Sequence, residues 1–186
     1  MLFRSRRMVL SGTWELPFGK GKALLSAARG PLGLMVGGWQ LNGIFTVQGG
    51  FPLGLTTASN QTNSFGGGSR PNNNGQSAAL SGAPRTRVDR WFNTSVFSQP
   101  ANFTFGNTGR TLPDVRTPGL SNLDFSITKF TNITERITHQ FRAEFFNAFN
   151  HPSFGSPGSA LGNANFGVIS SALDARIIQL GMKVLF

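Results

Sequence analysis

Most of the last stretch of the chain, residues 175–186, alternates between apolar side chains and polar or small ones. The apolar positions are Ile178, Leu180, Met182, Val184 and Phe186, and the positions between them are Gln179, Gly181, Lys183 and Leu185. Apart from Leu185, the second set is polar or small. Because successive side chains of a strand point to opposite faces, this segment would carry an apolar stripe on one face and a wetter stripe on the other. The chain therefore needs an apolar environment on one side of this strand.

Four earlier segments have the same two-residue period. With the last one, they predict strands near residues 8–18, 37–58, 120–130, 134–147 and 174–186. Long connections rich in Gly, Asn and Pro are expected at 60–117 and 148–173, and a tight hairpin connection is expected around Thr131 and Asn132. No apolar run is long enough for a membrane-spanning helix. The sequence predicts an all-β fold: an antiparallel meander of about five transmembrane strands, forming a partial outer-membrane β-barrel with long outer loops.

The alternation of long and short connections predicts a direction for every strand. Barrels of this kind have short periplasmic turns and longer outer loops, so Phe186 would lie at the periplasmic end. Counting back places Trp14 and Trp39 at the same interface, where aromatic side chains form girdles. The connection between these two strands, residues 18–36, is longer than expected, and its segment 23–28 is predicted to form a helical turn.

The net charge of +10 needs a separate explanation, since basic domains often bind nucleic acid. The arginines and lysines form neither a helical stripe nor an aromatic and basic strand motif of the kind that RNA-binding domains use. No nucleic-acid partner is therefore expected, and a basic nucleic-acid-binding protein stays only as the less favoured alternative. A soluble or secreted β-sandwich binding module remains as an alternative, because alternating strands with Gly/Asn loops suit that fold as well.

Several short motifs occur in a characteristic order along nearly the whole chain. They are GTWELPFGKGK at 12–22, GGWQLNGI at 37–44, RWFN at 90–93, FGN at 105–107, NLD at 122–124, FRAEFFNAFNHP at 141–152 and FG at 166–167, followed by the terminal strand. In this order they resemble the C-terminal part of Oar-like TonB-dependent receptors, outer-membrane receptors of the Acidobacteria type. The resemblance implies a role as a structural wall of a ligand-uptake pore.

The same resemblance implies further parts and partners. Such receptors combine a signal peptide, a carboxypeptidase-regulatory-like β domain, a plug domain and a barrel of about twenty-two strands. We expect this chain to be a fragment without its own signal peptide, located in the outer membrane as part of the receptor. Its expected partners are outer-membrane lipid, the remaining strands and plug, TonB through the missing N-terminal parts, and the barrel assembly machinery, which would read Phe186 as an assembly signal.

Catalysis, cofactors and metals are not expected. The chain contains no cysteine, its two histidines lie in separate segments, and no phosphate loop or catalytic triad order is present. One region merits a binding hypothesis: Arg85, Arg87 and Arg90 with Trp91 could contact lipopolysaccharide or an acidic or carbohydrate ligand from the outer loop. The simpler alternative is a loop with solvated arginines and aromatic side chains that fix it to the barrel rim.

Overall fold

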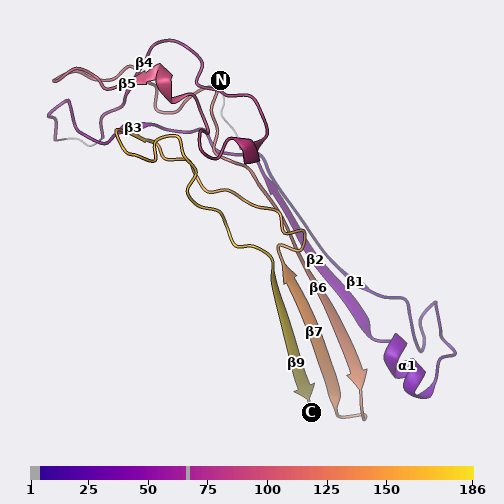
Figure 1. Cartoon of the computed structure of the whole chain (residues 1–186). Coiled ribbons are helices and arrows are strands. Elements are labelled where there is room, and N and C mark those ends of the chain that lie inside the picture. Colours follow the sequence, from indigo (N-terminus) through magenta and orange to yellow (C-terminus); the bar gives the residue numbers. More distant parts are fainter. Residues whose placement is uncertain (1–4, 66–67) are drawn as a thin grey trace. The chain divides into compact units, whose positions relative to one another are not determined.

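The computed structural model describes residues 5–65 and 68–186, and these residues form two compact units (Figure 1). The sheet unit comprises residues 8–47, 121–152 and 174–186. The loop unit comprises residues 48–120 and 153–173, together with residues 5–7. Each unit is therefore assembled from segments that lie far apart in the sequence.

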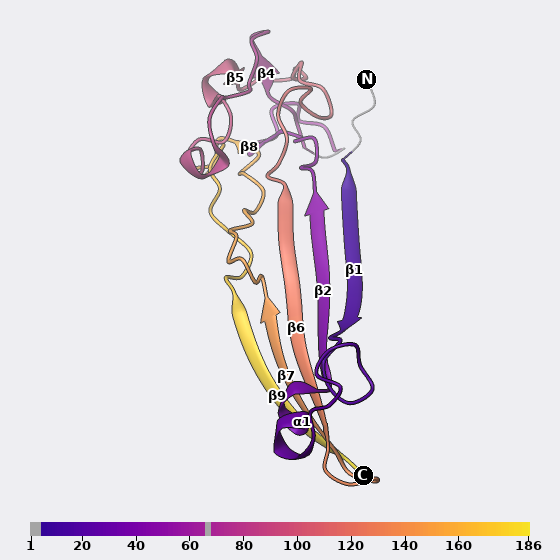
Figure 2. The same ribbon diagram turned by 90° about the vertical axis from the view of Figure 1, so that its right-hand side faces the viewer.

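The sheet unit is a five-stranded antiparallel meander. Its strands are β1 (Arg7–Glu15), β2 (Trp39–Gln48), β6 (Leu120–Asn132), β7 (Thr138–Phe146) and β9 (Ile177–Leu185). They follow the order β1, β2, β6, β7, β9, and neighbouring strands run in opposite directions (Figure 2). This arrangement confirms the predicted all-β meander. Among the described residues β1 and β9 form the two edges, so the sheet is open.

The register of β6, β7 and β9 follows the two-residue period of the sequence. Successive rows are Phe125, Phe145 and Ile178; Ser126, Glu144 and Gln179; Ile127, Ala143 and Leu180; and Thr128, Arg142 and Gly181. Apolar rows thus alternate with polar ones, as a sheet with two different surroundings requires.

The strand expected over 37–58 is shorter, because β2 ends at Gln48. The chain continues through Gly49 and Gly50 into the loop unit. A Cβ atom on Gly50 would overlap the backbone carbonyl of Thr117, so the two segments approach too closely for a larger residue. The apolar alternation after Gly50 continues into Leu53 and Leu55, which are core residues of the loop unit.

Two further expectations about the sheet unit need correction. The helix α1 covers Gly30–Val36, with Pro31 in its first turn, rather than residues 23–28. In the expected segment, Leu24 instead pairs with the backbone near Phe18. The hairpin connection lies at residues 133–137 rather than at Thr131 and Asn132, which still belong to β6.

The loop unit has little regular structure. It contains β3 (Thr56–Thr57), β4 (Asn72–Asn73), η1 (Pro84–Thr86), η2 (Thr94–Val96), β5 (Phe97–Ser98) and β8 (Ala160–Leu161). The parallel pair β3 and β8 joins the two long connections, and β4 pairs with β5 in antiparallel fashion. Both predicted loops therefore fold together into one unit.

A hydrophobic core holds the loop unit together. Phe92 is completely buried, and its ring makes edge-to-face contacts with Phe97 and Phe166 at centroid distances of 5.9 and 5.2 Å. Such pairs add about 0.5–1.5 kcal/mol each beyond the burial of area. The other buried apolar members are Leu53, Leu55, Ala78, Trp91, Val96, Phe97, Leu112, Val115 and Ile169.

Candidate functional site

The polar face of the sheet carries a continuous row of hydrogen-bonding side chains. The Thr13 hydroxyl donates to Asn42 Oδ1 at 2.9 Å, and Asn42 Nδ2 donates to Ser126 Oγ at 3.2 Å. Ser126 lies opposite Glu144, which in turn lies opposite Gln179. The row therefore crosses all five strands on one face and forms a surface that water can solvate.

Three charged residues, Asp124 of β6 and Arg142 and Glu144 of β7, lie on this same face. Arg142 Nε lies 3.5 Å from Glu144 Oε1, and Asp124 accepts hydrogen bonds from Asn122 Nδ2 at 2.9 Å and from the Asn147 amide at 3.0 Å. The Arg142 side chain is half exposed, so this ion pair contributes little to stability and mainly keeps the face polar.

The opposite face is apolar and uncovered. Leu180 and Met182 are 67% and 77% exposed, and Ile178 and Val184 on the same strand are also exposed. Ile127 and its neighbours in the apolar rows continue the face across β7 and β6. Monomeric proteins in water rarely expose an apolar surface that spans several strands. The acyl chains of a bilayer would bury it.

Lys129 is the exception on the apolar face, where it lies opposite Phe141. Its ammonium group donates to the carbonyls of Leu34, at 2.6 Å, and of Gly37, and it lies 5.5 Å from the centre of the Trp39 ring. These carbonyls are at the C-terminal end of α1, where a cation is favourable. Sequence reasoning missed this site, although a lysine at an apolar position of the alternation was a usable signal.

The predicted interfacial aromatics lie at one end of the sheet. Trp14 is the residue before the last of β1 and is 60% exposed, and Trp39 begins β2 and donates its indole N–H to the Met35 carbonyl at 2.9 Å. Phe186 follows the end of β9 directly. The helix α1 and the short turn between β6 and β7 are at this end too (Figure 2). Their roles as interfacial anchors, and that of Phe186 in assembly, stay predictions.

The four residues predicted for ligand contact differ in their accessibility within the loop unit. Trp91 is only 6% exposed and donates its indole N–H to the Arg116 carbonyl at 2.6 Å. The Arg87 guanidinium lies over the Trp91 ring at 4.7 Å and donates to the Leu80 carbonyl at 2.7 Å. Arg85 and Arg90 are exposed. Trp91 and Arg87 are thus part of the packing, and only Arg85 and Arg90 are free to meet a large ligand.

Asp114 fixes the backbone of residues 77–79 in the loop unit. Its carboxylate accepts hydrogen bonds from the Ser77 hydroxyl at 2.6 Å and from the amides of Ala78 and Ala79 at 2.8 and 3.3 Å. Partial burial acts to raise the pKa of Asp114, but these hydrogen bonds together outweigh it and hold the pKa below its ordinary value. The role of this carboxylate is therefore to fix the backbone.

Two negative findings apply to the part of the chain that the structure describes. None of its helices is long and apolar enough to cross a membrane. In the same residues, no group of three or more His, Asp or Glu side chains is placed to hold a metal ion.

An antiparallel meander with one polar face and one uncovered apolar face fits the wall of a transmembrane β-barrel. The comparison with protein families agrees: a model described as the outer membrane beta barrel domain matches residues 3–179. The chain belongs to this family, which places it in the outer membrane. No curated protein and no solved structure matches it.

Proposed function

We propose that the chain forms part of the pore wall of a TonB-dependent receptor of the Oar-like type, and that its role is ligand uptake rather than catalysis. The observation that carries this proposal is the polar row from Thr13 to Gln179, which crosses the whole sheet opposite an exposed apolar face. A face of this kind suits the lumen of a water-filled barrel. The ordered sequence motifs support the narrower receptor class.

The two sheet edges support a larger parent barrel. In lipid, every backbone N–H and C=O group needs a partner, because no water is available to bind it. Among the described residues, β1 and β9 each have one strand neighbour. We propose that further strands of the receptor pair with both edges, that a plug occupies the lumen, and that the barrel assembly machinery inserts the product. TonB would act on parts outside this chain.

Cysteine labelling in the receptor tests the pore wall. Because the chain contains no cysteine, single replacements report one position each. We expect S126C and Q179C to react with a water-soluble, membrane-impermeant maleimide, and I127C and L180C on the opposite face to resist it. Equal labelling of the two faces would refute the pore-wall role.

The receptor class needs a second measurement on the same variants. The plug of a TonB-dependent receptor changes its conformation when the inner membrane is energised, which alters access to the lumen. The labelling rate of Q179C should therefore differ between energised cells and cells whose proton-motive force has been collapsed. Identical rates would refute TonB coupling while leaving the pore-wall role intact.

A further inference from the structure

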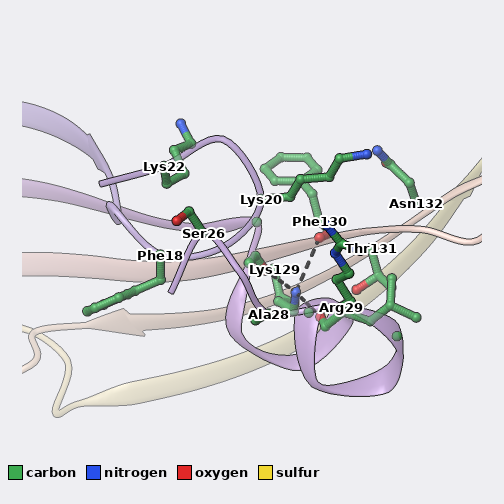
Figure 3. Close-up of a pocket in the computed structure, with 15 residues that line it drawn as sticks. Phe18, Lys20, Lys22, Ser26, Ala28, Arg29, Lys129, Phe130, Thr131 and Asn132 are labelled. Atoms are coloured by element: carbon green, nitrogen blue, oxygen red, sulfur yellow. Dashed lines mark hydrogen bonds between the residues drawn. The ribbon is translucent and has the colours of Figure 1, made fainter. Parts of the chain in front are cut away.

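The connection between β1 and β2 forms a basic cavity with the end of β6 in the sheet unit. The cavity measures about 680 Å³ and is lined by residues of the 18–38 segment and by Lys129, Phe130, Thr131 and Asn132 (Figure 3). Four cations line it, namely Lys20, Lys22, Arg29 and Lys129, and no Asp or Glu is among its described lining residues. Its chemistry favours an anion.

Two of these cations already have partners. Lys22 pairs with Glu15 at 2.9 Å, and the ammonium group of Lys129 is held by backbone carbonyls. Lys20 and Arg29 take part in no ion pair within residues 5–65 and 68–186. Both extend toward Thr131 and Asn132 (Figure 3). The side-chain oxygen Oδ1 of Asn132 accepts from the Thr138 hydroxyl at 3.0 Å, which leaves the Nδ2 group of Asn132 as a donor.

The connection that forms the cavity also exposes apolar side chains that do not line it. On α1, Leu32 and Met35 are 59% and 71% exposed, and their spacing of three residues puts them on one side of the helix. In the preceding segment, Leu24 and Leu25 are 50% and 56% exposed. An amphiphile that carries a negative head group and acyl chains would satisfy both parts of the surface.

The position along the sheet selects the membrane leaflet. The cavity is at the end that has the five-residue turn at 133–137, whereas the two long connections leave the other end. Short turns are periplasmic in outer-membrane barrels. We propose that this cavity binds the phosphate head group of an anionic phospholipid of the periplasmic leaflet, with Lys20, Arg29 and Asn132 as donors and α1 lying on the acyl chains. The proposal depends on the outer-membrane location of the chain and is independent of its role in uptake.

Lipid binding by the parent barrel in nanodiscs, with the full chain as part of it, tests the proposal. The probe is dansyl-labelled phosphatidylglycerol in phosphatidylcholine, and the readout is energy transfer from tryptophan to the dansyl group. Trp39 is a suitable donor because its ring lies 5.5 Å from the ammonium group of Lys129, which lines the cavity. We expect K20Q/R29Q to weaken binding about 30-fold, because each of the two cations near a membrane surface contributes about 1 kcal/mol. The charge-retaining variant K20R/R29K should bind as the unmodified chain does.

A matched variant separates binding at this cavity from general electrostatic attraction between the basic chain and anionic lipid. R136Q/K183Q removes the same charge from the same end of the sheet but outside the cavity, and we expect its affinity to change by less than about twofold. Equal losses in the two double variants, or no loss in K20Q/R29Q, would overturn the proposal. Saturation of the site by inorganic phosphate alone would also overturn it, because the acyl contacts would then be unnecessary.

Discussion

Adjacent residues of β9 provide a direct test of which face meets lipid. Leu180 lies in an apolar row with Ala143 and Ile127, near the middle of the strand, and Gln179 lies opposite Glu144 on the polar face. The variants L180R and Q179R therefore place the same charge at nearly the same depth, on opposite faces. Any difference between them reports the surroundings of the face.

The structure sets the size of the expected difference. Full burial of a leucine contributes about 1.5–3 kcal/mol, so the 67% of Leu180 that faces outward contributes about 1–2 kcal/mol in lipid. An arginine on the lipid face near mid-bilayer costs about 2–4 kcal/mol more. L180R should thus lose about 3–6 kcal/mol, whereas Q179R gains a cross-strand partner in Glu144 worth at most about 1 kcal/mol. The populations of inserted chain should differ at least 100-fold.

Flotation of the urea-solubilised parent barrel that carries each substitution, with phosphatidylcholine vesicles at graded urea concentrations, measures this difference. L180R should leave the vesicles at much lower urea than Q179R. In buffer without vesicles, L180R should be the more soluble of the two, because it interrupts an exposed apolar face. Equal flotation of both variants, or a soluble and cooperatively folded chain that L180R unfolds, would refute the lipid-facing assignment.

Four further predictions concern the rest of the chain. F92A should destabilise the loop unit by about 3–5 kcal/mol, seen as faster hydrogen exchange at the Trp91 and Ile169 amides, while F105A, at an exposed ring, should change it little. G38A should lower the urea midpoint for membrane insertion, because Gly38 has φ +75° and a Cβ atom there would overlap the Phe130 carbonyl. G181A is its control, since a Cβ atom on Gly181 would meet no described atom within 4 Å. The pKa of Asp114 is lower in the folded protein than in the unfolded chain, so the ionised carboxylate stabilises the loop unit at pH values above its unfolded pKa. This stabilisation is lost as the pH falls through the folded pKa of Asp114. D114N should therefore remove that part of the pH dependence of hydrogen exchange. R85A/R90A should reduce binding to lipopolysaccharide vesicles several-fold relative to R110A, and unchanged binding would exclude the outer-loop contact.

The strands of the sheet could be predicted because their surroundings impose a two-residue period. Their even numbers alone put Asp124, Arg142 and Glu144 on the faces that alternation assigns to polar residues, and the register brings those faces together. Asparagine side chains commonly bind turn backbone, and the two asparagines after β7 do so: Asn147 Oδ1 accepts from the His151 amide, and Asn150 Oδ1 accepts from the Arg176 amide.

What the period does not encode is which segment an apolar residue packs against. Leu53 and Leu55 continue the alternation of β2, yet they are buried in the loop unit. Trp91 beside three arginines has the composition of an exposed binding loop, but its burial depends on contacts with Arg116 and Gly167 that are distant in the sequence. The site around Lys129 was hidden for the same reason, because its partners are carbonyls of α1.

The pairing of β3 with β8 also constrains the order in which the protein can mature. Thr56 meets Ala160, and Phe92 packs on Phe166, so neither half of the loop unit has a complete core without the other. The chain between them includes the whole hairpin of β6 and β7. During synthesis and export, Leu53, Leu55 and Phe92 therefore stay uncovered until the later segment emerges. We therefore expect residues 53–92 to be among the aggregation-prone parts of the exported chain until residues 160–166 have emerged.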